Sequence, residues 1–86
     1  MRVIGYIEHP VYKISVFSWS EKYIVKIEAG FFEQSYKFRY DEFSNWEELK
    51  LVFDEVMIEA IRKTFMQMGK DMKEARISYG NKPRKV

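Results

Sequence analysis

Residues 44–80, SNWEELKLVFDEVMIEAIRKTFMQMGKDMKEARISYG, decide the fold, because they read as one long amphipathic helix with clear signals at both ends. Ser44 precedes Glu47 by three residues, which is the spacing of an N-terminal capping box. Gly80 and Pro83 are residue types that cap and stop a helix. We therefore predict a helix over about residues 45–78.

Two apolar stripes run along this helix. The first has the spacing of a core-facing stripe and consists of Trp46, Leu49, Phe53, Val56, Met57 and Ala60. The second repeats about every seventh residue, is interrupted by Asp54, and consists of Leu51, Ile58, Ile61, Phe65, Met68 and Met72. We interpret the second stripe as a seam for another helix. The alternative is one broad core stripe that drifts around the helix axis.

The length of the helix supports the seam. A straight helix over residues 44–80 would be about 50 Å long, whereas a compact domain of this size has a radius of gyration of about 12 Å. Either the helix bends, with Gly69 as its weak point, or its outer half packs on a second copy. We predict a homodimer, with parallel and antiparallel helix orientations both open.

The residues before the helix alternate between apolar and polar and predict four strands, at about 2–8, 11–19, 22–29 and 32–40. A two-residue turn at Ser20-Glu21 gathers the apolar side chains of strands two and three on one face. The next turn lies at 29–30 or at 30–31, of which the second suits a type II′ turn better. Gln34 falls on the apolar face and needs a hydrogen-bond partner.

These elements predict an α+β fold: a four-stranded antiparallel meander followed by one long C-terminal helix packed on one face of the sheet (ββββα). Residues 1–80 would form a single domain, and residues 81–86 a solvated basic tail. The 47% hydrophobic and 17% aromatic content excludes a disordered chain.

Charge and cysteine content narrow the function classes. The 15 basic and 13 acidic side chains leave a net charge of +2, too little to indicate a polyanionic partner by itself. The absence of cysteine excludes disulfides, thiolate metal sites and a cysteine nucleophile. No apolar run is long enough to span a bilayer, and the first residues do not resemble a signal peptide. We expect a cytoplasmic protein with no membrane partner.

Catalytic signals are weak. His9 is the only histidine, and it precedes Pro10 at a predicted turn without a metal-ligand neighbour. Glu55 and Glu59 lie four residues apart, but Glu59 also has the spacing of a surface ion pair with Lys63. We expect no catalytic, metal or cofactor residues, and we rank an enzyme third among the functions.

The mixed face of the sheet is the candidate binding surface. Ile24 and a set of aromatic and cationic side chains share this face, the set being Lys13, Phe17, Trp19, Lys22, Lys26, Lys37 and Arg39. Aromatic rings that stack on bases, set among cations, are typical of single-stranded nucleic-acid platforms. Glu28 and Glu33 count against this hypothesis. The alternative is a protein-interaction module that uses the Phe17 and Trp19 patch, and a purely structural role is a further alternative.

The predicted topology, four antiparallel strands and one long helix that pairs with another copy, resembles the PUR and Whirly type of single-stranded nucleic-acid-binding dimer. The resemblance covers residues 2 to about 78 and concerns topology alone, since no motif of those families is matched. It implies a nucleic-acid-binding dimer but assigns no residue. The sequence therefore predicts a small non-catalytic homodimer that acts as a binding or regulatory module.

Overall fold

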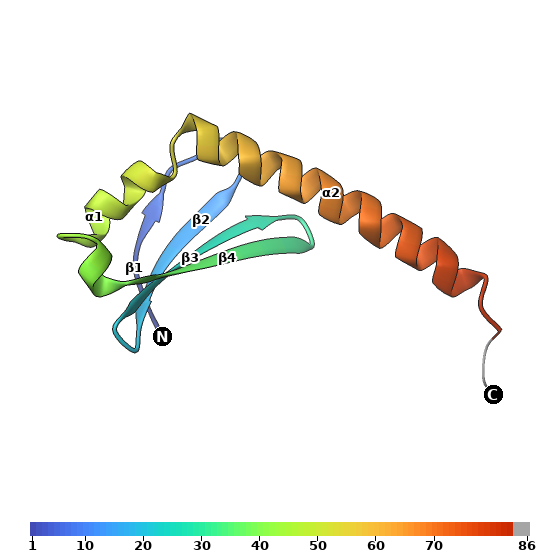
Figure 1. Ribbon diagram of the computed structural model, residues 1–86, viewed down its shortest axis with the longest axis horizontal. Coiled ribbons are helices and arrows are strands. Elements are labelled where there is room, and N and C mark those ends of the chain that lie inside the picture. Colours follow the sequence, from blue (N-terminus) through green and yellow to red (C-terminus); the bar gives the residue numbers. More distant parts are fainter. Residues whose placement is uncertain (84–86) are drawn as a thin grey trace.

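The computed structural model describes residues 1–83, which form one antiparallel sheet followed by helices (Figure 1). The strands are β1 (Arg2–Ile7), β2 (Lys13–Trp19), β3 (Lys22–Ala29) and β4 (Phe32–Arg39), and they lie in the order β1-β2-β3-β4. The helices are the 3-10 turn η1 (Tyr40–Glu42), α1 (Trp46–Leu49), the 3-10 turn η2 (Lys50–Val52) and α2 (Glu55–Gly80). The predicted ββββα fold class is confirmed.

The sheet has the predicted register at the Ser20-Glu21 turn and one of the two registers left open at the next turn. Trp19 pairs with Lys22, so Ser20 and Glu21 form a two-residue turn, and both have positive φ angles, as a type I′ turn requires. Ala29 pairs with Phe32, so the next turn is Gly30-Phe31, with φ +60° at Gly30. A glycine at the first central position is the type II′ arrangement, which decides between the two registers left open above.

Strand β1 is irregular, because its register shifts between Val3 and Gly5. The shift turns Gly5 and Ile7 towards the core face and leaves Val3 and Tyr6 on the other face. A Cβ added at Gly5 would lie 2.4 Å from Cη2 of Trp46. The Trp46 indole therefore lies directly on the β1 backbone at Gly5. Only glycine, which has no Cβ, leaves room for the ring there.

The long helix predicted for residues 45–78 is broken before α2. Asn45, and not Ser44, caps α1 by accepting the amide N–H of Glu48 at 3.0 Å. The chain turns at Phe53, and the Asp54 carboxylate then caps α2 by accepting the N–H of Met57 at 2.9 Å. Asp54 is thus a new helix start, and the break lies there and not at Gly69. The break allows Leu49 and Phe53 to enter the core together.

The predicted division of the helix into a core stripe and a dimer seam does not match the packing. Val56 and Ala60 of the expected core stripe are exposed. Ile61 and Phe65 of the expected seam are buried in the core, and Ile58 and Met68 pack against it. Leu51 and Met72, the two ends of the seam, are exposed. The physical reason is the restart at Asp54, which rotates the second stripe onto the sheet of the same chain.

A buried polar contact holds α2 in this position. Gln34, on the core face of β4, is 8% exposed, and its Nε2 donates to the Ile61 carbonyl oxygen at 3.0 Å. The Tyr36 hydroxyl donates to Gln34 Oε1 at 2.5 Å. This is the hydrogen-bond partner that the sequence requires for Gln34.

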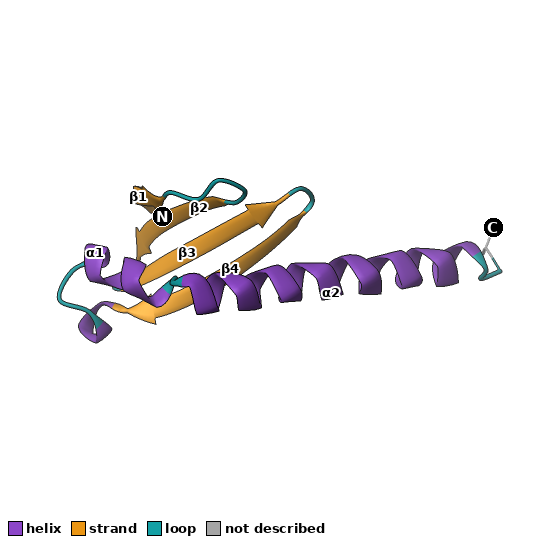
Figure 2. Cartoon of the chain, turned by 90° about the horizontal axis from the view of Figure 1, so that it is seen from above, coloured by secondary structure: helices purple, strands orange, loops and turns teal. Residues whose placement is uncertain are grey.

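The carboxyl-terminal part of α2 extends beyond the sheet (Figures 1 and 2). Residues 70–80 are all exposed, and the molecule measures 54 × 29 × 19 Å. Its radius of gyration of 16.6 Å exceeds the ~12 Å expected for a compact chain of this length. The predicted overshoot is therefore present. We call residues 70–80 the overhang. Of the predicted tail, residues 84–86 lie outside the described part of the chain.

Replacing Gly5 with alanine should destabilise the fold, because the new methyl group would overlap Trp46. Overpacking of this kind costs about 1–3 kcal/mol. Urea unfolding followed by circular dichroism would measure the loss. Gly80→Ala is the matched control, since nothing lies within 4 Å of a Cβ added there, and its stability should not fall. Equal stability of Gly5→Ala and the wild type would refute the close packing.

Replacing Gln34 with leucine should also lower the free energy of unfolding, because Tyr36 loses its hydrogen-bond acceptor at a half-buried site. The expected loss is about 1–3 kcal/mol, the cost of an unsatisfied buried polar group. Ser35→Ala, at the neighbouring exposed position, should change stability by less than about 0.5 kcal/mol. Thermal melts of both variants would test the difference, and indistinguishable melts would contradict the role of Gln34.

Candidate functional site

The face of the sheet turned away from α1 and α2 is uncovered, and we call it the open face (Figure 1). Strand pairing arranges its side chains in four rows across the sheet. The first row is Trp19, Lys22 and Arg39; the second is Val3, Phe17, Ile24 and Lys37; the third is Tyr6, Ser15, Lys26 and Ser35; the fourth is Lys13, Glu28 and Glu33. All seven predicted surface residues therefore share one face.

The exposure of the apolar members differs from the prediction in the middle of the face. Trp19 is 55% exposed, but Ile24 is only 4% exposed. Ile24 lies on an inner strand between Phe17 and Lys37, whose longer side chains shield it from water. Phe17 is itself half-buried, with the Lys26 ammonium 5.1 Å from its ring centroid. The centre of the open face is thus a cation over an aromatic ring.

Sequence reasoning missed the contribution of β1 to this face. Tyr6 is 57% exposed and lies beside Ser15, and Val3 is 43% exposed and lies beside Phe17. Strict alternation along β1 cannot place both residues on one face, because they are an odd number of positions apart. The register shift between Val3 and Gly5 makes this possible. Gly5 was the available signal, since glycine inside a strand often marks such an irregularity.

The charges on the open face are segregated. The first three rows hold Lys22, Lys26, Lys37 and Arg39 and contain no acidic residue. Glu28 and Glu33 lie together in the fourth row, where Lys13 is 4.0 Å from Glu28. Residues 1–43 carry no net charge, but on the open face the cations of the first three rows are separated from the carboxylates of the fourth row. We call these two parts of the face its basic end and its acidic end.

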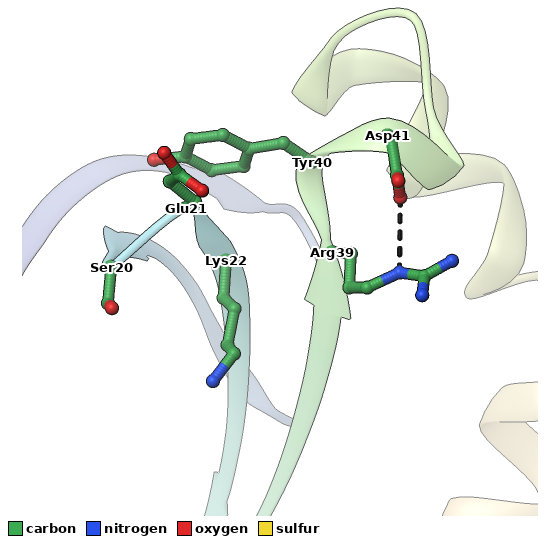
Figure 3. A pocket seen from close by; sticks show the side chains of 6 residues that line it. All are labelled: Ser20, Glu21, Lys22, Arg39, Tyr40 and Asp41. Atoms are coloured by element: carbon green, nitrogen blue, oxygen red, sulfur yellow. Dashed lines mark hydrogen bonds and ion pairs between the residues drawn. The ribbon is translucent and has the colours of Figure 1, made fainter.

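A shallow depression of about 500 Å³ lies at the basic end of the open face (Figure 3). Its lining combines the cations Lys22 and Arg39 of the first row with two carboxylates, Glu21 of the β2–β3 turn and Asp41 of η1, and is completed by Ser20 and Tyr40. Arg39 Nε donates to Asp41 Oδ1 at 3.1 Å, and the Tyr40 hydroxyl is hydrogen-bonded to Ser18 Oγ. Lys22 extends away from the Tyr40 ring and makes no ion pair with a described residue.

His9 is a structural turn residue. Its Nδ1 accepts the backbone N–H groups of Val11 and Tyr12, both at 3.1 Å, and its ring stacks on Tyr12 with 4.9 Å between centroids. Tyr12 in turn packs against Phe65 of α2, so the turn is attached to the core. The two amides share the single lone pair of Nδ1, so this acceptor is used inside the chain. Within residues 1–83, no cluster of three or more potential metal-ligating side chains occurs.

Glu59, one of the two helix carboxylates considered above, lies in an ion pair with Arg62. Glu59 accepts a 2.6 Å hydrogen bond from Arg62, not from Lys63 as the spacing suggested, and this bond lowers the pKa of the Glu59 carboxyl group. The pKa of Arg62 is raised by the same contact. The side chains are about half exposed, so this is a surface ion pair on α2.

No family model, curated protein or solved structure matches this chain. The resemblance to PUR and Whirly proteins therefore stays a likeness of predicted topology. Within residues 1–83, no helix is both long enough and apolar enough to cross a membrane.

Replacing His9 with alanine should lower the free energy of unfolding by about 1 kcal/mol, because two turn amides lose their acceptor. His9→Asn should retain most of the stability, since an asparagine side chain can accept from amides two and three residues ahead. Urea titrations of the two variants compare these effects directly. An alanine variant as stable as the asparagine variant would show that the acceptor is unimportant.

Proposed function

We propose that this protein is a non-enzymatic binding module whose open face binds single-stranded nucleic acid. The observation that carries the proposal is the coincidence of exposed aromatic rings and four cations, without acidic residues, in the first three rows. Sequence-tolerant recognition of a single strand needs rings for the bases and cations for the phosphates.

Trp19 and Tyr6 supply the stacking surfaces. Each is more than half exposed, and they come from β2 and β1, two rows apart. Phe17 lies between them but is partly covered by Lys26. A base could reach Phe17 only by displacing the Lys26 ammonium. We therefore assign stacking to Trp19 and Tyr6 first.

The phosphate contacts would come from the β3 and β4 side. Lys22 and Arg39 are neighbours in the first row, Lys37 follows in the second, and Lys26 in the third. These side chains are exposed except Lys26, which is half-buried. Glu28 and Glu33 would repel a backbone in the fourth row. The bound strand would thus cover the first three rows and leave the fourth row free. Near the β2–β3 turn its phosphates would compete with Asp41 for Arg39 and pass Glu21.

A protein-interaction surface is the second candidate, and the exposed apolar atoms favour it. Val3, Tyr6 and Trp19 are 43%, 57% and 55% exposed on one face, and such clusters also occur where proteins dock. Salt separates the two candidates, because phosphate binding releases counterions and apolar docking does not.

We also propose that the chain is a homodimer joined through α2, and that it is cytoplasmic. The exposed overhang supports the first proposal, and the cysteine-free sequence is compatible with the second.

Titration of a fluorescent oligothymidylate, followed by anisotropy at increasing salt, tests the proposal. With four cations in contact, the logarithm of the association constant should fall with a slope of about −3 against the logarithm of salt concentration. Trp19→Ala should weaken binding by about 5- to 150-fold, the range expected for one lost stacking partner. Lys26→Glu should weaken binding and reduce the slope.

Lys63→Glu is the matched control, since it makes the same charge change on an exposed residue of α2, away from the open face. Its binding should be close to that of the wild type. Absence of binding at low salt, or equal losses in Lys26→Glu and Lys63→Glu, would rule out nucleic-acid recognition by the open face.

A further inference from the structure

We infer that the dimer interface is the overhang of α2, on which a second copy of the chain lies antiparallel over residues 68–79. The inference rests on the homodimer proposed above and replaces the seam expected over residues 51–72. It specifies which residues meet and in which direction the two helices run.

The apolar stripe that docks α2 on the sheet continues past the sheet. Ile61, Phe65 and Met68 contact the core at spacings of four and three residues. The same spacing continues through Met72, Ala75 and Tyr79, so these positions share one side of the helix. Met72 is 41% exposed, although the side of the helix that carries it is buried two turns earlier. The overhang thus exposes an apolar stripe that has the spacing of a core-facing stripe, beyond the part of α2 that packs on the sheet.

The sheet decides the orientation of a partner helix. Along residues 58–68 the apolar side of α2 is already occupied by the sheet of the same chain. A parallel partner would bring both sheets into the space between the two helices. An antiparallel partner places the two sheets at opposite ends, and each overhang then fills the space beside the other. With residues 68 and 79 opposed, Met72 faces Ala75 of the other copy.

Charge complementarity supports a second copy as the occupant. An added Cβ at Gly69 would lie 4.0 Å from Phe32, so the β3–β4 hairpin tip lies where the partner's overhang would end. Glu28 and Glu33 oppose each other near this tip, on the open face of the sheet and thus on the side turned away from α2, and their like charges repel each other. Lys13 lies 4.0 Å from Glu28, but Glu33 makes no ion pair within residues 1–83 and accepts only from Ser35 Oγ.

The end of the overhang that would arrive at this tip is basic. Arg76 and Lys82 are exposed there. A two-fold axis between the overhangs therefore brings each basic end against the partner's hairpin tip, and its side chains would reach Glu28 and Glu33 on the open face around that tip. Phe31, which is 100% exposed at that tip, would gain an apolar neighbour from the same approach.

The contact is short. Twelve residues of helix span about 18 Å, so the interface lies at the small end of stable protein contacts, and we expect a dissociation constant of about micromolar. Sedimentation equilibrium without nucleic acid, at roughly 0.1 mM chain, should therefore give mainly a dimer. A monomer under these conditions would overturn both the dimer and its interface.

Two substitutions on opposite sides of the overhang test the interface. Met72→Asp should raise the dimer dissociation constant by roughly 100-fold or more, because the dimer would bury a carboxylate. Ile77→Asp is the control, since Ile77 is 56% exposed on the other side of the same helical turns and should leave the dimer intact. Both chains should fold normally by circular dichroism. A dimer that survives Met72→Asp, or dissociates equally in Ile77→Asp, would overturn this interface while leaving the homodimer and the nucleic-acid proposal standing.

Single cysteines test the orientation, because the chain has no other cysteine. On oxidation, a mixture of Met72→Cys and Ala75→Cys chains should form the mixed disulfide. Met68→Cys should not cross-link to itself, since the two residues would lie about 16 Å apart along antiparallel helices. An efficient Met68→Cys homodisulfide would show parallel helices and overturn the proposed arrangement.

Discussion

The docking of α2 on the core face through Ile61 and Phe65 is the contact on which the rest of the structure depends. Both side chains are nearly inaccessible, and Gln34 adds a directional bond to the Ile61 carbonyl oxygen. A helical carbonyl oxygen has a second lone pair, so it can accept this bond while keeping its place in the helix. Rotation of α2 about its axis would break this bond and expose the apolar stripe. The position of the helix is therefore determined by both apolar and polar contacts.

One consequence is that one face of the sheet is covered and the other is exposed to solvent. The helical segments provide cover for the core face only, and the chain has no further element for the other face within residues 1–83. Aromatic and cationic side chains on the open face are exposed for this reason. Another consequence is that α2, starting near one end of β4, reaches the hairpin tip at Gly69 and continues beyond it. The open face and the overhang thus both follow from where α2 begins.

The sheet was predictable from sequence because its constraints are local. Alternation in β2, β3 and β4 and two-residue turns determine which side chains share a face. Ser20 and Glu21 are not favoured turn residues, yet cross-strand pairing alone indicated the correct register. The irregularity in β1 was not predictable in this way, since it depends on the Trp46 ring packing over Gly5. Consequently the β2–β4 part of the candidate site was predicted, and the Val3 and Tyr6 part was missed.

The helix break was not predicted because an aspartate at position 54 is compatible with two structures. Asp54 interrupts an apolar stripe when the helix is continuous, but it is a strong N-cap when a helix begins there. Both readings fit the local sequence, and tertiary burial of Leu49 and Phe53 selects the second. Similarly, Ser44 and Asn45 are both good caps, each followed three residues later by a glutamate. The exact start of α1 therefore depends on packing and not on capping preference.

The existence of the overhang needs no partner, since a helix already nucleated on the sheet can extend into solvent with little cost per residue. The spacing of its apolar residues is more informative than its length. Alanine and methionine are good helix formers and stabilise a solvated helix by themselves, but Met72 and Ala75 also keep the phase set by Ile61 and Phe65. Ile77 shows that apolar residues also occur out of phase. Met72 and Ile77 therefore lie on opposite sides of one helical segment, and only the side of Met72 continues the stripe that packs on the sheet.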